Sequence, residues 1–418
     1  MGHRTVALQL KEPRVDSRKG WWVVFGCMLT MTITAGVGFS SMAVLADNIL
    51  KNTGWDELDF ALGVTVWGLS AAVVSPFCGR WIDQYGPRPM IMAGICLAAI
   101  AEFMLGRVTQ LWQYYTLLAI LPLGIMLCTY MPIATVVTHW FRKKINIATG
   151  LAMLGIGLGG GLAPLITQAL VAQYEFRTTF TILAGILLCA LIPSYIWIHS
   201  PDEELEVNSS AEEQDQHDSD LSLGRALKTR SFWGLSVGDM LTGMVFAIFT
   251  QLLVLYLINE TNDEQFAAAV LATLSVGLGF GILVFGPLGD IFNFRRVIVL
   301  CYFLPAVGTV CILASDTHIM AFTFAVIAGF AGGGRSALFP VAISSSFGHT
   351  HMAAIYGVSN TLFMIGTGVG PVIAGLIYKE TGNIHHIYLF GIVLFVASAA
   401  LVALIRDERA PETVPSES

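Results

Sequence analysis

The stretch GRWIDQYGPR at residues 79–88 has a counterpart, GPLGDIFNFRR, at residues 286–296. In each stretch a glycine is followed by an aspartate after four residues and by an arginine after five more. Each comes directly after a long apolar run, and the two lie 207 residues apart. Short polar stretches between apolar runs are typical of connections between helices. The recurrence indicates that the chain contains a duplication.

Further matches extend this repeat through both halves of the chain. Pro132 pairs with Pro340 after a slip of one residue. At the original spacing of 207 residues, a second set of small residues and prolines also recurs: Gly150, Gly159, Gly161 and Pro164 with Gly357, Gly366, Gly368 and Pro371. Matches in the same order at nearly one spacing predict two homologous halves. Parallel repeats around a site at the middle of the bilayer are a design of secondary transporters.

The composition indicates an integral membrane protein. The 418 residues are 55% hydrophobic and 12% charged, whereas soluble domains carry about 25% charged residues. The net charge of −7 comes mostly from residues 201–230, which argues against a surface that binds phosphate. The seven cysteines form no CxxC pair and lie in or beside apolar runs, which predicts buried, unreactive thiols. Soluble enzymes, disordered proteins and nucleic-acid binders are therefore excluded.

Apolar runs of about 20 residues are long enough to cross a bilayer as helices. Twelve such runs are present: 21–46, 60–79, 89–108, 113–138, 145–171, 178–199, 232–258, 265–287, 297–314, 318–345, 352–377 and 386–405. They are continuous and do not alternate, which excludes a transmembrane barrel. We therefore expect an all-α membrane protein with twelve transmembrane helices in two pseudo-symmetric six-helix bundles.

The distribution of lysine and arginine orients these spans. With a cytoplasmic N-terminus, 17 basic residues fall on the cytoplasmic side and 4 on the other side. The positive-inside rule therefore predicts a multi-pass protein of the cell membrane with both termini in the cytoplasm. The expected parts are a tail at 1–20, a six-helix half at 21–199, a cytoplasmic linker at 200–231, a second half at 232–406 and a tail at 407–418. The linker is acidic and serine-rich over 201–220, which is typical of disorder, and 221–230 can form a short surface helix.

The stretch at 79–88 closely resembles the signature between the second and third helices of the major facilitator superfamily, and 286–296 resembles its copy in the second half. The resemblance covers essentially the whole chain. WFRKK at 140–144, followed by ATGLA at 148–152, is similar to the monocarboxylate-porter and oxalate/formate-exchanger branch, as is GTGVGP at 366–371. The resemblance implies a transporter that alternates access to a central site, with spans one, four, seven and ten lining the cavity.

The repeated stretch also has a physical interpretation of its own. Asp83 and Asp290 are expected just past the ends of spans two and eight, where a carboxylate can cap a neighbouring helix and pair with Arg88 or Arg295. We interpret these groups, with Gly79, as a gate on the cytoplasmic face. The alternative is ordinary turn chemistry at helix ends. The glycine-rich runs at 155–161 and 366–370 have no flanking strand, so we interpret them as helix-packing surfaces and not as phosphate loops.

Three ionisable residues lie well inside the predicted spans: Glu102, Asp239 and Arg335. An arginine at the centre of a span costs about 2.5–3.5 kcal/mol, so a partner or a function must offset it. Arg335 follows three glycines, which we expect to weaken the helix around it, and its guanidinium is suited to a bidentate hold on a carboxylate. The alternative is a structural ion pair with Asp239 or Glu102. A carboxyl group removed from water can carry a proton near neutral pH, so Asp239, and with less support Glu102, are candidates for proton coupling.

Polar and aromatic residues on the expected cavity helices complete a candidate site for a small amphipathic anion. They are Thr30 and Thr34 on one face of span one, Tyr130 on span four, Ser336 and Phe339 beside Arg335, and Asn360 on span eleven. Monocarboxylate porters carry a lysine in the first span and an Asp/Arg pair in the eighth, and this chain has neither. The anion-binding role is therefore assigned to Arg335 from its chemistry.

These observations predict a secondary transporter of a small organic monocarboxylate, with a proton as the coupling ion. Carboxylate exchange and proton-driven efflux of hydrophobic compounds are the alternatives, and a transport-free sensor is disfavoured because only a disordered linker lies outside the bundle. The sequence has no phosphate loop for ATP, no nucleophile–base set and no metal spacing among its nine histidines. We therefore expect no enzymatic activity, no cofactor and no nucleic-acid partner, and a monomer that contacts substrate, protons and lipid.

Overall fold

The computed structural model describes residues 18–40, 45, 49, 53–55, 57–141, 143–199, 221–261, 264–314 and 318–405. In these ranges there is no strand, and twelve helical segments are long and apolar enough to cross a membrane. The predicted all-α fold with twelve spans is therefore confirmed. The segment 201–220, which we expected to be disordered, lies outside the described residues, as do 1–17 and 406–418.

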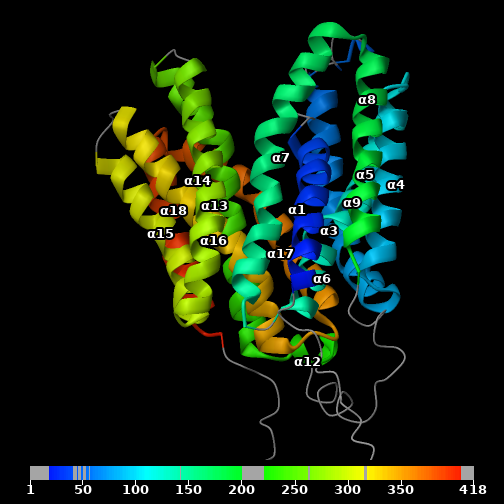
Figure 1. Ribbon diagram of the computed structural model, residues 1–418. Coiled ribbons are helices and arrows are strands. Elements are labelled where there is room, and N and C mark those ends of the chain that lie inside the picture. The colour runs from blue at the N-terminus through cyan, green and yellow to red at the C-terminus, as the bar shows by residue number, and fades with distance from the viewer. Residues whose placement is uncertain are drawn as a thin grey trace, which may run out of the picture.

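The first half of the chain forms spans one to six (Figure 1). Its elements are α1 (Arg18–Ala35) with the π-helical turn η1 (Gly36–Ser40), α3 (Glu57–Tyr85), α4 (Pro87–Leu105), α5 (Leu111–Cys128), α6 (Tyr130–Trp140), α7 (Ile145–Gln173), α8 (Phe176–Cys189) and α9 (Leu191–Trp197). Span four is thus interrupted between α5 and α6, where Thr129 has φ −113° and ψ −123°. Span six is divided between α8 and α9.

The second half forms spans seven to twelve. Its elements are α13 (Arg230–Thr261), α14 (Glu264–Ile291), α15 (Phe294–Ala314), α16 (His318–Phe347), α17 (Met352–Thr381) and α18 (Ile384–Val402). Before it lies the short helix α12 (Leu223–Ala226), where we had expected a helix over 221–230. We call the end of the bundle where α12 lies the α12 end, and the opposite end the far end (Figure 1).

The repeated stretch lies at the α12 end, and its helices run further than the apolar pattern predicted. Span two was expected to stop at residue 79, but α3 continues to Tyr85. Gly86 then turns the chain with φ 82°, a conformation that favours glycine, and Pro87 begins α4. Asp83 and Asp290 therefore lie in the last turns of α3 and α14 and not beyond them. The prediction failed because it followed hydrophobicity, which ends before the helical hydrogen bonding does.

The two halves meet along two seams, and glycines allow the close approach in both. In the first, α3 packs on α17. A Cβ atom on Gly79 would overlap the carbonyl oxygen of Ala353, and one on Gly357 would lie 2.5 Å from that of Ser75. Ordinary Cβ atoms do not approach a carbonyl oxygen so closely, so these positions require glycine.

The second seam, between α7 and α14, is the image of the first. A Cβ atom on Gly286 would lie 3.0 Å from the carbonyl oxygen of Asn146, and one on Gly150 would lie 3.1 Å from that of Ile282. Each residue of this seam corresponds to one of the first seam at the spacing of 207 residues. The duplication seen in the sequence is therefore also a duplication of contacts between the halves.

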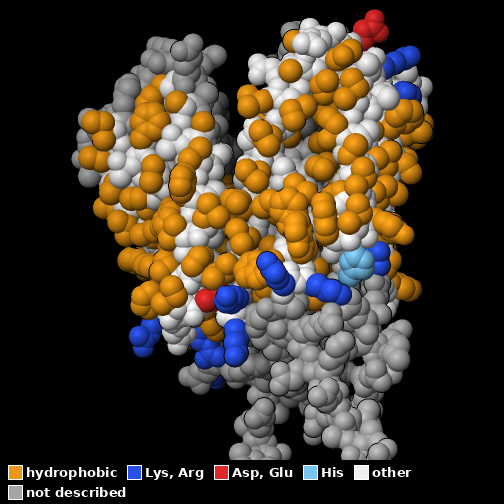
Figure 2. All heavy atoms as spheres, viewed as in Figure 1, with side chains coloured by type: hydrophobic (Ala, Val, Ile, Leu, Met, Phe, Trp, Pro, Cys, Tyr) orange, Lys and Arg blue, Asp and Glu red, His pale blue; other side chains and the backbone are white. Residues whose placement is uncertain are grey.

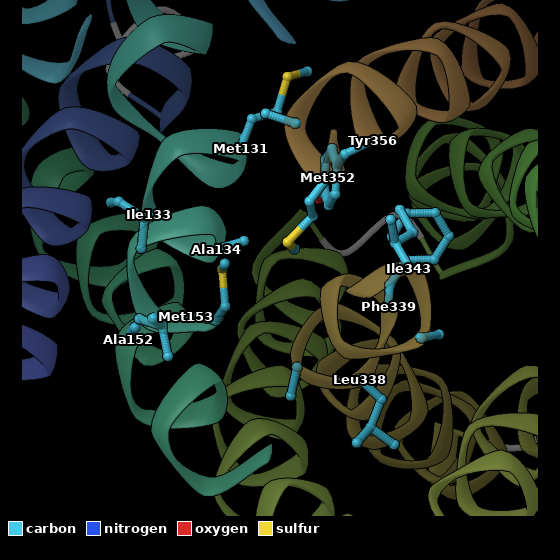
Figure 3. Packing of buried hydrophobic residues seen from close by; sticks show 14 of the residues in the cluster. Met131, Ile133, Ala134, Ala152, Met153, Leu338, Phe339, Ile343, Met352 and Tyr356 are labelled. Atoms are coloured by element: carbon cyan, nitrogen blue, oxygen red, sulfur yellow. The ribbon is translucent and has the colours of Figure 1, made fainter. Parts of the chain in front are cut away.

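A continuous apolar core joins the halves between these seams. Met131 and Ala134 of α6 lie opposite Met352 and Tyr356 of α17, with Phe339 and its neighbours on α16 beside them (Figure 3). The hydroxyl of Thr138 also donates to the sulfur of Met352 at 3.2 Å. At the far end the space-filling view shows a notch between the halves (Figure 2). The pathway between the halves is therefore closed toward the α12 end.

Glycines also pack helices within each half. A Cβ atom on Gly155 or Gly159 of α7 would overlap a backbone oxygen of α1. A Cβ atom on Gly366 or Gly370 of α17 would likewise overlap a backbone oxygen of α13. This confirms the helix-packing interpretation of the glycine-rich runs. The glycines before Arg335 have the same role, since Gly333 and Gly334 pack on α14 and α15. The expectation that they weaken the helix was wrong, because α16 is continuous from His318 to Phe347.

Large apolar side chains cover the outer surface of the bundle, where a membrane would contact it. Hydrophobic side chains dominate the face in Figure 2, and the lysines and arginines on it gather mainly toward the α12 end. Leu69, Val73, Leu165 and Tyr195 are examples of exposed side chains, at 62–65% of their full exposure. Water alone does not favour so much exposed apolar surface, whereas hydrocarbon does.

Candidate functional site: a cavity with a buried ion pair

A cavity of about 410 Å³ lies between the halves, on the far-end side of their apolar core. Most of its lining comes from the second half, from α13 to α18. The first half contributes Trp67 of α3, Met126 of α5, and Thr129, Tyr130 and Met131 at the break between α5 and α6. Phe339, Tyr356 and Met131 belong to both the cavity lining and the apolar core, so they form its floor.

The charged residues in the described lining of the cavity, Arg335 and Asp239, form an ion pair. Nη1 of Arg335 on α16 donates to Oδ1 of Asp239 on α13 at 2.5 Å. The hydroxyl of Tyr302 on α15 donates to the same oxygen at 2.6 Å. The side chain of Asp239 is 3% exposed, and that of Arg335 is 20% exposed toward the cavity. Of the alternatives left open by the sequence, the pairing with Asp239 is therefore present.

The guanidinium is held on a second side by an aromatic ring. Its central carbon lies 4.6 Å from the centroid of the Phe363 ring on α17. A cation over an aromatic face is stabilised by about 0.5–2 kcal/mol, with the larger values in sites that exclude water. The arginine is thus positioned by α13, α15 and α17 together, and part of its surface still faces the cavity.

Besides Arg335 and Asp239, four other predicted site residues line this cavity: Tyr130, Ser336, Phe339 and Asn360. The hydroxyl of Ser336 donates to the carbonyl of Gly332 at 3.0 Å, which leaves its oxygen able to accept. Nδ2 of Asn360 donates to the hydroxyl of Ser75 on α3 at 3.1 Å. Asn360 therefore connects the cavity to the seam between α3 and α17.

Thr30 and Thr34 do not line the cavity. Both are fully buried on the opposite face of α1, where Oγ1 of Thr30 lies 3.0 Å from Oγ of Ser194 on α9. Oγ1 of Thr34 donates to the carbonyl of Thr30 at 2.8 Å. Their spacing of four residues correctly placed them on one face of the helix. Periodicity does not say which face meets the cavity, and here that face packs inside the first half.

Glu102 also lies away from the cavity. It is buried in α4, with 2% of its surface exposed, and α4 contributes no residue to the lining. Among the described residues its carboxyl group has no hydrogen-bond or ion-pair partner, so it is not part of the Arg335–Asp239 cluster.

The two aspartates of the repeated stretch cap helices of the opposite half at the α12 end. Oδ1 and Oδ2 of Asp83 accept the backbone N–H groups of Ala353 and Ala354 at 3.1 and 2.8 Å. These residues begin α17, where unpaired N–H groups and the helix dipole favour an anion.

Asp290 makes the equivalent contacts on α7. Its Oδ1 accepts from the backbone N–H of Asn146 at 3.2 Å and from Nδ2 of the same residue at 2.6 Å, and its Oδ2 accepts from the N–H of Ile147 at 3.0 Å. Together with the contacts of Asp83 we call these the two aspartate caps. Both tie one half of the molecule to the other beside the glycines of the seams.

The arginines of the repeated stretch point elsewhere. Arg88 donates to the backbone oxygen of Tyr195 at 3.1 Å, and its guanidinium lies 5.4 Å from the ring of the same residue. The guanidinium of Arg295 lies 5.9 Å from the ring of its neighbour Phe294. These contacts of Arg88 and Arg295 lie within their own half.

Comparison with known proteins identifies the family. The sequence pattern of the Major Facilitator Superfamily matches residues 27–270 and 235–418. The chain belongs to the Major Facilitator Superfamily. It is 25% identical to monocarboxylate transporter 12 of Mus musculus over 94% of this chain and 86% of the relative. It is 23% identical to the aspyridones efflux protein apdF of Emericella nidulans over 77% and 64% of the two chains.

A solved structure supports the same conclusion for the fold. FucP, a transporter of the superfamily crystallised in the outward conformation, superposes with a TM-score of 0.74 at 14% identity and covers 93% of this chain and 99% of its own. The superfamily and the twelve apolar helices together make this chain a multi-pass membrane transporter and not an enzyme. No group of three His, Cys, Asp or Glu side chains in the described part of the chain could hold a metal ion.

This member of the superfamily has functional candidates that the sequence did not reveal. Tyr302 was missed because a tyrosine within a span is common, although a buried phenol usually needs a hydrogen-bond partner. Trp67, Phe246 and Phe324 were missed because aromatic residues in spans read equally well as packing or lipid contacts. Only their convergence on one cavity distinguishes them.

Proposed function

We propose that this protein is a secondary active transporter of an organic monocarboxylate, driven by co-transport of a proton. Arg335 binds the carboxylate of the substrate, and Asp239 carries the proton. The observation that carries the proposal is the ion pair in the cavity wall, where Arg335 is partly exposed and Asp239 is buried. Relatives named for monocarboxylate transport support the choice of substrate class.

The charges of the pair give a simple coupling rule. In the empty site the guanidinium and the carboxylate of Asp239 neutralise each other. A substrate anion adds a negative charge, and a proton on Asp239 removes one, so the loaded site is again neutral. A site with an unpaired charge is unfavourable inside a membrane protein, because burial of the charge must be compensated. The empty and fully loaded states can therefore change conformation, and partly loaded states cannot do so easily.

In this proposal the proton binds Oδ2 of Asp239. Arg335 and Tyr302 both donate to Oδ1 of Asp239. A proton on Oδ2 therefore does not need to replace either donor. The neutral acid is a weaker acceptor for the guanidinium than the carboxylate, so the substrate carboxylate takes its place with a charge-assisted hydrogen bond. Tyr302 keeps the protonated side chain in position.

Alternating access in this proposal is a rocking of the two halves about the cavity. The aspartate caps of Asp83 and Asp290, with the glycines beside them, hold the α12 end closed. Opening that end breaks both caps and separates the apolar core below the cavity. Tyr130, Ser336, Phe339 and Asn360 contact the substrate in the cavity. Thr30, Thr34 and Glu102 have no direct part, because they lie outside it.

The proposed setting follows from the basic residues. The loops on the side of α12 are rich in lysine and arginine, so we place them in the cytoplasm, with both termini, and the protein in the cell membrane. The cavity is then closed toward the cytoplasm. We propose that a single chain suffices, since both halves of the transport pathway are present within it.

Two alternatives remain as outcomes of the tests. Carboxylate exchange keeps Asp239 ionised and needs a second anion on the opposite side. The second alternative, proton-driven efflux of hydrophobic compounds, has support from the aromatic lining of the cavity and from an efflux protein among the relatives. A proton-coupled carboxylate carrier runs in either direction according to the gradients, so the coupling is tested first.

The test is uptake of labelled lactate into proteoliposomes that contain the full-length protein, with and without an inward proton gradient. We expect uptake to rise with the gradient and to fall to the level of empty liposomes for Arg335→Gln. Uptake that ignores the gradient but requires unlabelled lactate inside would establish exchange. Equal uptake by wild type and Arg335→Gln would overturn the proposed function.

A further inference from the structure

From the shape of the cavity we infer that the preferred substrate is an amphipathic acid: a carboxylate joined to an extended aromatic or aliphatic body, which binds more tightly than an acid of two or three carbons such as lactate. This inference rests on the proposed function and narrows its substrate class. Acids that small need only the region around Arg335. The cavity extends well beyond that region, and its extension has a different chemistry.

The cavity is much larger than a short acid requires. Its volume of about 410 Å³ is within the range of pockets that bury most of a drug-sized molecule. A carboxylate with one or two further carbons would leave most of it to water. Water is a poor neighbour for the apolar side chains that line the remainder, so a larger apolar ligand has more to gain there.

The apolar region lies on one side of the charged pair. Phe246 and Phe249 follow Asp239 along α13 by seven and ten residues, and Phe324 precedes Arg335 on α16 by eleven. At 1.5 Å per residue, an apolar arm of about 15 Å extends from the pair toward the far end. Leu274 of α14 and Phe395 of α18 complete its wall. The arm has the length of a phenylalkyl group or a medium alkyl chain.

The aromatic rings of this arm are held in place by one another. Phe249 lies 4.8 Å from Phe324 between ring centroids and is stacked on Tyr388 at 5.5 Å and on Phe395 at 6.3 Å. Rings packed in this way form a wall with little freedom to collapse into the cavity. Phe246 also lines the cavity, and 41% of its surface is exposed.

The polar lining is confined to the head of the cavity and to isolated hydroxyl groups. The head of the cavity contains the charged pair of Arg335 and Asp239, with Ser336 and Asn360 near it. The described lining residues of the arm carry no charge. A sugar or a dicarboxylate would require hydrogen-bond or charge partners along its whole length. The arrangement therefore favours one anionic group and an apolar remainder.

The experiment measures binding to the full-length protein in detergent by calorimetry, with propionate, gluconate, 4-phenylbutyrate and 4-phenylbutyramide. We expect 4-phenylbutyrate to bind at least about 30-fold more tightly than propionate, since burial of the phenylalkyl body adds apolar contact. Gluconate, of similar length but polar, should bind no better than propionate. The amide, which lacks the anion, should bind at least about tenfold more weakly than the acid.

Two matched variants separate the arm from the rest of the molecule. Phe246→Ala should weaken 4-phenylbutyrate about fivefold and leave propionate unchanged, in keeping with the loss of one aromatic contact. Phe280→Ala is the control, because Phe280 is 61% exposed on α14 and does not line the cavity. Its binding constants should equal those of the wild type.

The outcomes distinguish this inference from the proposed function. If propionate and 4-phenylbutyrate bind equally, and the amide does not bind, the protein is a carboxylate transporter and the inference about the apolar body is wrong. If acid and amide bind equally, the role of Arg335 as anion site fails, and the acid class fails with it. Absence of binding by every compound would overturn both.

Discussion

At the scale of single residues, the transport chemistry that we propose involves one buried ion pair among the described residues of the cavity. Nη1 of Arg335 lies 2.5 Å from Oδ1 of Asp239. Tyr302 donates to the same oxygen, so the cluster contains residues of three helices. A buried ion pair contributes little net stability compared with an apolar replacement, but the loss of one partner leaves an uncompensated charge. A contribution to folding stability alone does not account for the pair, and the proposed function assigns it to coupling.

Asp239→Asn separates substrate binding from proton coupling. The amide resembles a permanently protonated aspartate, so the variant should bind carboxylate without a requirement for protons. Its empty site has an unpaired Arg335, and reorientation of the empty carrier should be blocked. We expect proton-driven net uptake to fall at least about tenfold, while exchange of labelled for unlabelled lactate persists. Normal net uptake with normal dependence on the gradient would show that another group carries the proton.

Stability measurements test the same pair independently of transport. Arg335→Gln should lower the free energy of unfolding by about 3 kcal/mol, because Asp239 loses its partner in a buried site. The double variant Arg335→Gln/Asp239→Asn should recover most of that loss and still fail to transport. Thermal melting of the detergent-purified proteins provides the measurement. A double variant that is less stable than Arg335→Gln would contradict the pairing.

At the scale of helices, the apolar runs predicted the existence of every span but not their ends. The helices α3 and α14 continue past residues 79 and 287, where the apolar runs were expected to end, and their last turns place Asp83 and Asp290 as caps for α17 and α7. Spacing placed Thr30 and Thr34 on a common face, yet only the packing of α1 on α9 decides that this face is turned away from the cavity. The sequence pattern thus shows which residues share a face of a helix, and only the packing between helices shows what that face contacts.

The candidate site was predictable to a similar extent. Charge inside a span is rare enough that Arg335 and Asp239 were identified directly, and they proved to be partners. Tyr302 and the aromatic arm were not identified, since phenylalanine and tyrosine are ordinary residues of membrane helices. Glu102 is also a charged residue type inside a predicted span, but it lies in α4, away from the cavity. An ionisable residue in a span suggests a function, but the sequence does not show whether it faces the cavity.

The glycines of α17 provide a prediction for the seams. Gly357→Ala places a methyl group 2.5 Å from the carbonyl oxygen of Ser75, so α3 and α17 must separate. Such overpacking typically destabilises by about 1–3 kcal/mol. Gly368→Ala is the matched control on the same helix, since nothing lies within 4 Å of its added Cβ atom. Comparison of melting temperatures should show a loss for Gly357→Ala and no loss for Gly368→Ala; equal effects would contradict the close contact at the seam.

At the scale of the whole molecule, the duplication appears as a pair of equivalent closures. The caps by Asp83 and Asp290 and the two glycine seams correspond residue by residue across the repeat. Each cap satisfies backbone N–H groups at the start of a helix in the opposite half, and a lost cap costs about 0.5–2 kcal/mol. Two equivalent caps therefore bias the molecule toward the form that is closed at the α12 end.

Removal of the caps should shift this equilibrium. Spin labels on Tyr174→Cys and Thr381→Cys report the separation of the halves at the far end, with the exposed Cys96 and Cys189 replaced by serine. We expect Asp83→Asn to increase the population of short distances, and Asp83→Asn/Asp290→Asn to increase it further, about tenfold for each 1.4 kcal/mol of lost cap energy. An unchanged distance distribution in the double variant would refute the role of the caps.

The central claim is that one proton accompanies each carboxylate, so that the site is neutral when empty and when loaded. Its most direct test records labelled lactate uptake and internal acidification of the same proteoliposomes, with the membrane potential set by potassium and valinomycin. The account predicts one proton for each lactate, a rate that does not change with the potential, and loss of proton movement in Asp239→Asn. A rate that follows the potential, or lactate uptake without acidification by the wild type, would contradict it.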